Sequence, residues 1–389
     1  RNIMMSPLSG VQKGEAFDVK PYAEAAAEYL LSIAGEIHMP RKLKVAFCNG
    51  ADDTVHSAFR DMGFVANLDV TFTLRIAGGL GGGYKMGVLV DEHVPATEIL
   101  YYIRAMIETF CQHGNYENRA KARTRFMQET LGVDGLKAAF LENVAKMKEK
   151  GGLDLHVTAK PVTKKGSGEI VDKRVVAQKQ TGLYAVAYHP IGGCLPAGKP
   201  AELLTLVREI PDAECRIAPH ETIYIINLTA DEAEKVLEVT NDGAKSTFEN
   251  SVACIGAAIC QQGVRDSQAA PRAAVEAVRE AKIPDGALPR ICISGCPSSC
   301  SGHQAAALGF QGAAKTVDGK PESAFKMFVG GSDKLGAAKF GEAGAVILER
   351  DLPKFFVELG KAVASRNMNW ETWIAGHEDE FKAIVEKYA

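Results

Sequence analysis

The sequence predicts an α+β protein in which one domain occurs twice. Stretches with strand and helix patterns are mixed along all 389 residues. Three landmarks also recur in the same order about 250 residues later, namely a proline, a glycine pair and a second proline. They lie at 40, 78–79 and 95 in the first copy and at 289, 330–331 and 353 in the second. Chance rarely keeps three matches in register, so we infer a duplicated domain.

The repeat divides the chain into four segments. The two copies take residues 1–150 and 243–389, with a basic linker or loop at 151–179 and a small α+β unit at 180–242 between them. In the first copy, the apolar patterns predict helices at 20–37 and 95–114, strands at 43–49 and 69–79, and further helix from about 117 to 150. In the small unit they predict a strand, a helix, two strands and a second helix.

The stretch 159–182 carries six Lys or Arg residues and two acidic ones, among turn-forming residues. A solvated loop is the simpler interpretation. The alternative is a surface that meets an acidic electron carrier, because opposite charges steer two proteins together.

The composition is that of a globular protein, with 46% hydrophobic and 24% charged residues and a net charge of −3. Nothing in this balance marks a nucleic-acid-binding protein, and no apolar run reaches the length of a transmembrane helix. No signal peptide opens the chain, so we expect a cytoplasmic protein without nucleic-acid or membrane partners. The opening "RNIMMSPLSG" has no initiator methionine, and we expect an N-terminally truncated part of a longer protein.

Four of the nine cysteines form two close pairs. Cys254 and Cys260 enclose five residues, and Cys296 and Cys300 enclose three. Thiolates hold iron–sulfur clusters, and small neighbouring residues let the backbone offer N–H groups to the sulfurs. Such residues are Gly256, Ala257, Ala258, Gly295, Ser298, Ser299 and Gly302. Structural zinc and unrelated buried thiols remain as alternatives, although zinc sites generally use shorter spacings. Cys292 makes a rival pair with Cys296, but its alternating position predicts a buried strand thiol.

These cysteines, spaced C-x5-C and GCPxxC ahead of "ALGFQG", resemble those of the siroheme- and cluster-containing nitrite and sulfite reductases. The motifs "RN…PLSG", "PRKLK" and "NRAKART" extend the resemblance over nearly the whole chain. It implies duplicated reductase domains with a ferredoxin-like half-domain ahead of the second copy. It also implies a 4Fe-4S cluster held by Cys254, Cys260, Cys296 and Cys300, with Cys300 bridging to the iron of a siroheme.

Reduction of sulfite to sulfide or of nitrite to ammonia takes six electrons and needs cations that hold the anion and supply protons. Lys42 and Lys44 stand two apart, so a strand would present both on one face, where neighbouring like charges lower a lysine pKa. On its own, a K-x-K motif is more simply interpreted as the solvated end of a strand. The resemblance implies that both lysines and Arg1 line the substrate site.

Siroheme carries eight carboxylates, which guanidinium groups pair well. "NRAKARTR" places Arg119, Lys121 and Arg123 on an expected helix, either as siroheme contacts or as a solvated basic face. The glycines at 78–83 either let the backbone approach the macrocycle closely or form a plain turn. His303 is expected either to be solvated or to lie next to the cluster ligands.

The resemblance implies an assimilatory enzyme that receives single electrons from ferredoxin or a similar carrier, since no flavin or nicotinamide motif is present. In the family, a further arginine of the pocket comes from an upstream half. The alternative is therefore a catalytically incomplete fragment, or a cluster-binding regulatory scaffold of the same fold. The residues do not separate sulfite from nitrite, and the opening segments slightly favour sulfite.

Overall fold

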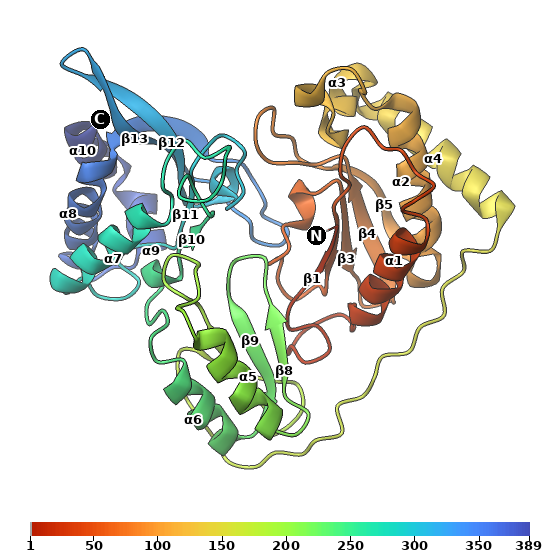
Figure 1. Cartoon of the computed structure of the whole chain (residues 1–389), viewed down its shortest axis with the longest axis horizontal. Helices are drawn as coiled ribbons and strands as arrows, with labels where there is room; N and C mark the ends of the chain where they lie inside the picture. The colour runs from red at the N-terminus through yellow and green to blue at the C-terminus, as the bar shows by residue number, and fades with distance from the viewer. Residues whose placement is uncertain (1) are drawn as a thin grey trace. The chain divides into compact units, whose positions relative to one another are not determined.

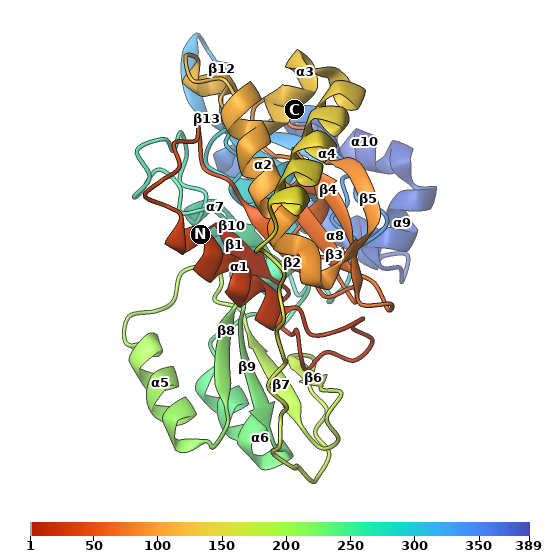
Figure 2. The ribbon, with the colours of Figure 1, turned by 90° about the vertical axis from the view of Figure 1, so that its right-hand side faces the viewer.

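The computed structural model describes residues 2–389, which form two compact units (Figures 1 and 2). The first unit comprises the chain up to residue 169 together with 177–185 and 334–336. The second comprises 170–176, 186–333 and 337–389. Among the described residues, no helix has the length and apolar character needed to cross a membrane.

The first unit is built on a five-stranded sheet with the order β1-β2-β3-β4-β5 (Figure 1). The first three strands are parallel and the last two join them antiparallel. The strands are β1 (Ile3–Met5), β2 (Val45–Cys48), β3 (Met62–Ala66), β4 (Thr71–Ile76) and β5 (Val88–Pro95). Strand β2 is buried at every position, as expected for a parallel strand inside a sheet.

Helices bury one face of this sheet. They are α1 (Lys20–Ser32), α2 (Ile99–His113), α3 (Met127–Thr130) and α4 (Gly132–Lys150), with 3-10 turns η1 (Ser57–Phe59), η2 (Ala96–Glu98), η3 (Arg119–Lys121) and η4 (Thr124–Phe126). Alternate strand residues such as Phe47, Phe64 and Phe72 pack with the apolar side of α2 in one core. This core fixes the register of the sheet, because a slip of one residue would turn each aromatic ring to the other face.

The second unit contains a sheet of the same order and strand directions, β10-β11-β12-β13-β14. Its strands are β10 (Val252–Ala253), β11 (Ile291–Ser294), β12 (Leu308–Val317), β13 (Lys320–Val329) and β14 (Glu342–Leu348). The accompanying helices are α7 (Ala269–Glu280), α8 (Leu352–Ala364), α9 (Trp370–Gly376) and α10 (Glu378–Tyr388), with turns η5 (Phe248–Asn250), η6 (His303–Ala305) and η7 (Glu349–Asp351). The repeated topology confirms the duplication.

Between the copies, a four-stranded sheet has the order β6-β7-β9-β8. Its strands are β6 (Val175–Ala177), β7 (Tyr184–Tyr188), β8 (Glu214–Ile217) and β9 (Ile223–Leu228), and its helices are α5 (Lys199–Glu209) and α6 (Ala230–Val239). Helix α6 begins with a capping box in which Thr229 and Glu232 satisfy each other's backbone N–H groups. Residues 151–174 contain neither helix nor strand.

The two sheets align through one pair of glycines. Gly63 pairs with Arg75 and packs under η1, and Gly309 pairs with Phe328 and packs under η6. In this alignment only Arg290 separates Pro289 from β11, whereas Arg41 to Lys44 separate Pro40 from β2. The extra residues of the first copy include both predicted lysines, and they reduce the separation of the copies from 249 residues at the prolines to 246 at the first residues of β2 and β11.

We expect Gly63→Ala to lower the free energy of unfolding by about 3 kcal/mol, because a Cβ would lie 2.1 Å from the backbone oxygen of Ser57. Gly82→Ala is the matched control, since nothing lies within 4 Å of a Cβ there. Denaturant unfolding followed by circular dichroism measures both. Equal midpoints for the two variants would show that η1 does not depend on this contact.

Candidate functional site

The two cysteine-bearing loops of the second unit begin at the ends of neighbouring parallel strands. Cys254 follows β10, and Cys296 follows β11 after Gly295. The carboxyl ends of parallel strands meet at one edge of a sheet, so strand pairing alone brings the loops together. The N–H of Cys254 donates to the backbone oxygen of Ile293 at 3.0 Å and continues the pairing by one residue.

The peptide of Gly295 joins the loops directly. Its N–H donates to Sγ of Cys254 at 3.2 Å, and its oxygen accepts from the N–H groups of Val264 and Arg265 at 2.8 and 3.0 Å. Sγ of Cys254 also lies 3.1 Å from Oγ of Ser267. Backbone N–H contact with a cysteine sulfur is the environment that a cluster thiolate needs.

Glycine is required at the crossing of these loops. A Cβ on Gly295 would lie 2.5 Å from the oxygen of Arg265, and one on Gly256 would lie 2.6 Å from the nitrogen of Ser267. Gly256 also has φ +63°, in the left-handed region. Cys260 is held in a turn by its N–H bond to the oxygen of Gly256 at 2.8 Å. The small residues of the sequence motif therefore allow close backbone packing.

The second pair lies in a tight turn. Cys296 is buried and Cys300 is exposed, and the N–H of Gly302 donates to the oxygen of Ser299 at 3.2 Å. Hydroxyl groups of Ser294 and Ser301 lie 2.6 Å apart and hold the turn to the end of β11. None of the nine cysteines takes part in a disulfide.

Within residues 2–389, no three Cys, His, Asp or Glu side chains are placed to hold one metal ion. A four-iron cluster does not require such convergence, because each of its cysteines binds a different iron atom. The free thiols, the N–H group directed at sulfur and the close-packed glycines fit a cluster.

The rival thiol Cys292 lies inside β11, where it pairs with Val252 and Gly309. It is buried with Val252 and Ala306 in a small apolar cluster. Burial raises the pKa of its thiol to about 12. It is the buried strand thiol that its alternating position predicts.

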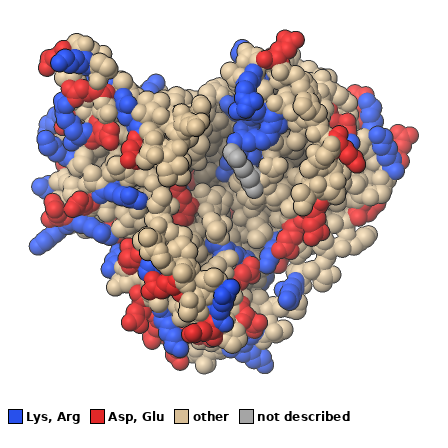
Figure 3. All heavy atoms as spheres, viewed as in Figure 1, with Lys and Arg blue, Asp and Glu red and all other residues tan. Residues whose placement is uncertain are grey.

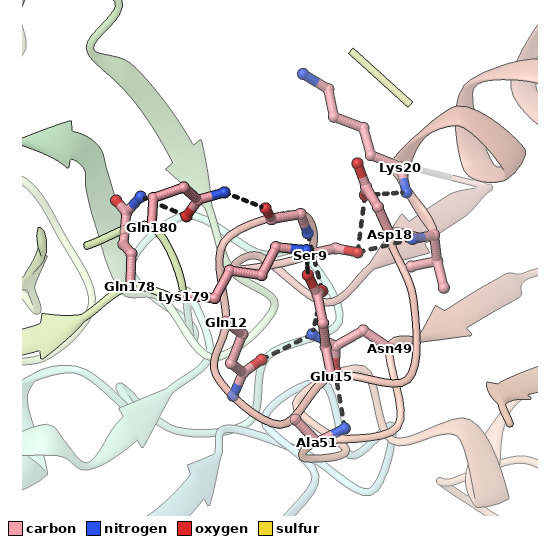
Figure 4. A network of polar contacts seen from close by, with 12 residues as sticks. Ser9, Gln12, Glu15, Asp18, Lys20, Asn49, Ala51, Gln178, Lys179 and Gln180 are labelled. Atoms are coloured by element: carbon pink, nitrogen blue, oxygen red, sulfur yellow. Dashed lines mark hydrogen bonds and ion pairs between the residues drawn. The ribbon is translucent and has the colours of Figure 1, made fainter. Parts of the chain in front are cut away.

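The first unit has corresponding loops, in which Ser6 stands at the position of Cys254 and Gly50 at that of Cys296. Ser6 follows β1 as Cys254 follows β10, and Oγ of Ser6 accepts from the N–H of Asn49 at 3.1 Å. Around it, the side-chain amide of Asn49 donates to Gln12 at 2.8 Å and to Glu15 at 3.3 Å (Figure 4). Glu15 also accepts from Lys179 at 2.6 Å. Side chains of the first unit therefore satisfy one another's polar groups in these loops.

The two predicted lysines of the first unit precede β2 and do not lie within it. Leu43 is buried between them, Lys42 is exposed and Lys44 is partly buried. Burial lowers the pKa of Lys44 to about 8, and the charges of Arg60, Arg123 and Lys42 add to this effect. The lowered lysine pKa that the sequence predicts is present at Lys44.

The buried carboxylate of Asp61 organises these cations. It accepts from the N–H of Lys44 at 2.8 Å and from Nη2 of Arg123 at 2.7 Å, and the hydroxyl of Thr124 donates to its other oxygen. Sequence analysis missed Asp61, because a single aspartate between two apolar stretches gives no signal.

Two further arginines, also missed, add positive charge. Arg60 is partly buried and donates from Nε to the oxygen of Val55 at 2.8 Å, and desolvation of the guanidinium lowers its pKa to about 10. The pKa of Arg41 is lowered by burial and then by the charges of Arg119 and Arg123. Figure 3 shows Lys and Arg side chains gathered on one face of the first unit.

The expected helix through "NRAKARTR" is wrong. The segment forms the 3-10 turns η3 and η4, because Asn118 caps the first by accepting from the N–H of Ala120 and Thr124 bonds to Asp61. Arg119 and Lys121 are exposed on η3, and only Arg123 turns to Asp61. Arg1 lies outside the described residues.

The glycines at 78–83 pack against the protein's own side chains. Arg125 donates from Nη2 to the oxygen of Gly82 at 2.6 Å, and from Nε to that of Gly83 at 3.0 Å. A Cβ on Gly79 would lie 2.9 Å from Cδ of Arg125. A turn around Arg125 thus accounts for these glycines.

Comparisons with known proteins agree with this architecture. Residues 1–148 match the family model described as the nitrite and sulphite reductase 4Fe-4S domain. The chain is 27% identical over 359 residues to the chloroplastic ferredoxin–nitrite reductase of Arabidopsis thaliana, covering 85% of this chain and 58% of that protein. It is 24% identical over 349 residues to sulfite reductase (ferredoxin) 1 of Mycolicibacterium paratuberculosis, covering 85% and 60%. The chain thus spans less than two thirds of the length of these relatives.

The solved structure of the NirA protein of Mycobacterium tuberculosis superposes with a TM-score of 0.77 at 22% identity, covering 97% of this chain and 71% of that one. The expected α+β fold and the resemblance to the nitrite and sulfite reductases are confirmed. The four cysteines lie outside the residues that match the family model.

The low pKa of Lys44 predicts a pH dependence of folding stability. A lysine with a folded pKa of about 8 and an ordinary value of 10.5 opposes folding at neutral pH, and the penalty disappears as pH rises through this interval. Between pH 7 and 10.5 we expect the wild type to gain about 2 kcal/mol relative to Lys44→Met in denaturant unfolding. Lys42→Met, at an exposed position, should keep most of the gain, because burial is the largest cause of the low pKa and the charge of Lys42 is a smaller one. Parallel curves for wild type and Lys44→Met would contradict the assignment.

Proposed function

We propose that this chain belongs to an assimilatory oxidoreductase that reduces sulfite to sulfide, or nitrite to ammonia, by six electrons at a siroheme. The electrons come singly from ferredoxin or a similar carrier. The observation that carries the proposal is the pair of cysteine loops joined through Gly295, on a chain similar to ferredoxin-dependent reductases of both anions.

The thiolates of Cys254, Cys260, Cys296 and Cys300 hold a 4Fe-4S cluster, and Cys300 is also the ligand shared with the siroheme iron. When bound, these groups pass single electrons to the iron at which the anion is reduced. The N–H of Gly295 stabilises negative charge on the sulfur of Cys254. The exposure of Cys300, beside the buried Cys296, suits a sulfur that has a further partner.

The cations of the first unit bind the negative groups. Lys42 and Lys44 hold the substrate anion together with Arg1, and a pKa of about 8 lets Lys44 both carry charge and give up a proton near neutral pH. Arg119, Lys121 and Arg123 pair with carboxylates of the siroheme. The ion pair with Asp61 fixes the orientation of the Arg123 guanidinium before any ligand binds.

A cluster-binding scaffold without catalysis is the second candidate. The two lysines argue against it, because a scaffold needs no ammonium group desolvated among arginines. The cytoplasmic location, and the absence of nucleic-acid and membrane partners, stay predictions.

Cys300→Ser is expected to abolish both the cluster and turnover, because serine is a poor ligand for iron in a cluster. The measurement is iron and sulfide content with the absorption spectrum of the full-length, anaerobically purified protein, reduced and then mixed with sulfite or nitrite. Cys292→Ala is the matched control and should keep the wild-type spectrum. A normal cluster and full rate in Cys300→Ser would refute the shared-ligand assignment. The anion that shifts the haem band identifies the substrate.

Lys42→Ala and Lys44→Ala should keep both cofactors and reduce kcat at least a hundredfold, because each removes a cation that holds the anion and supplies protons. Turnover with a reduced one-electron donor is compared with cofactor content for each variant. Lys85→Ala, which removes a partly exposed lysine that pairs with Glu129, is the control and should retain full rate. Unchanged kcat in both lysine variants would show that the anion binds at another site.

A further inference from the structure

The turn that carries Cys300 contains three buried polar atoms without a hydrogen-bond partner. They are Oγ of Ser299 and both ring nitrogens of His303. Ser299 is 5% exposed and His303 is 0% exposed, so solvent does not satisfy them. Of the two alternatives expected for His303, a solvated side chain is therefore wrong, and a neighbour of the cluster ligands stays a prediction. An unpaired polar group at this depth costs enough free energy to require a partner.

The two corresponding side chains of the first unit are satisfied. In the alignment that matches Gly63 with Gly309, Asp53 and Ser57 correspond to Ser299 and His303. Asp53 accepts from the N–H of Ser57 at 2.8 Å and from its hydroxyl at 2.7 Å. Oγ1 of Thr54, at the position of Cys300, is buried without a partner. The turn of the first unit therefore leaves one polar atom unpaired, at the place of a cysteine, and the turn of the second unit leaves three.

The ring of His303 is a neutral donor. Burial lowers its pKa to about 4, so one ring nitrogen carries a proton and the other does not near neutral pH. The ring packs at 4.9 Å from that of Phe328, which restricts its rotation. The side chain of Gln311 lies near the ring and opposes this lowering of the pKa, although the two do not meet the distance and angle of a hydrogen bond.

We propose that Ser299 and His303 are positioning residues that donate hydrogen bonds to sulfur atoms of the cluster and thereby raise its reduction potential. The inference rests on the proposed function, since it requires the cluster at Cys296 and Cys300. Reduction adds negative charge to the sulfurs, so a donor stabilises the reduced form more than the oxidised form. The bond from the N–H of Gly302 to the oxygen of Ser299 closes the turn around Cys300, and His303 begins η6 directly after this turn.

The test is a potentiometric titration of the cluster in the holoenzyme, followed by electron paramagnetic resonance. Ser299→Gly removes the hydroxyl without strain, because Ser299 has φ +54°. His303→Leu removes the ring donor. At a fixed potential near the midpoint, each change should lower the ratio of reduced to oxidised cluster by about tenfold. His303→Gln, which restores an N–H donor, should recover most of the ratio.

Ser57→Ala is the matched control, since it removes an equally buried hydroxyl from the corresponding turn of the first unit. It should not change the ratio. Unchanged midpoints in both Ser299→Gly and His303→Leu would overturn the proposal.

A second measurement compares the wild type with the Ser299→Gly/His303→Leu double variant. After exchange into deuterium oxide, pulsed electron paramagnetic resonance of the reduced wild-type cluster should detect couplings to exchanged deuterons, two of which are missing in the double variant. Identical couplings in the wild type and the double variant would overturn the inference while leaving the cluster intact. A wild-type protein without iron and sulfide would instead overturn the proposed function on which the inference rests.

Discussion

The candidate cluster site depends on the backbone of one residue. The N–H of Gly295 donates to the sulfur of Cys254 and its oxygen accepts from the N–H groups of Val264 and Arg265, so the chain before Cys296 is bonded to both ends of the preceding loop. Only glycine fits, because a Cβ would lie 2.5 Å from the oxygen of Arg265. Of the five groups in these bonds, only the sulfur of Cys254 belongs to a side chain. The contact between the two loops is therefore made mostly by backbone atoms.

The first unit stores unfavourable electrostatic energy at its surface. Arg60 and Lys44 are desolvated close to Arg123, and the lowered pKa values of Arg60 and Lys44 measure the cost. Asp61 offsets part of it, through an ion pair and two further hydrogen bonds. Under the proposed function, a bound anion would offset the rest. Positive charge that is preorganised in this way would bind an anion without reorganisation of the protein.

The sequence predicts the parts of this molecule that depend on local pattern or repetition. The duplication, the cysteine pairs and the glycine crossing at 256 and 295 follow from spacing and residue size. Arg60 and Asp61 do not, because their roles arise when η1 and β3 are brought against the segment before β2. The helix predicted around Arg119 fails for the same reason. A hydrogen bond from Thr124 to a carboxylate 63 residues away outweighs the local helical propensity.

The duplication also shows what a cysteine changes in this fold. At the end of β1 and at the end of β10, the same backbone bond reaches the same side-chain position, which is an oxygen in Ser6 and a sulfur in Cys254. The first copy then completes its loops with Gln12, Glu15 and Asn49, all of which find partners within the unit (Figure 4). The second copy leaves Ser299 and His303 unpaired in the turn of Cys300. One backbone frame therefore carries two different sets of polar side chains, which bond to one another in the first copy and stay unpaired at Ser299 and His303 in the second. The difference between the two copies lies in the side chains that follow each strand.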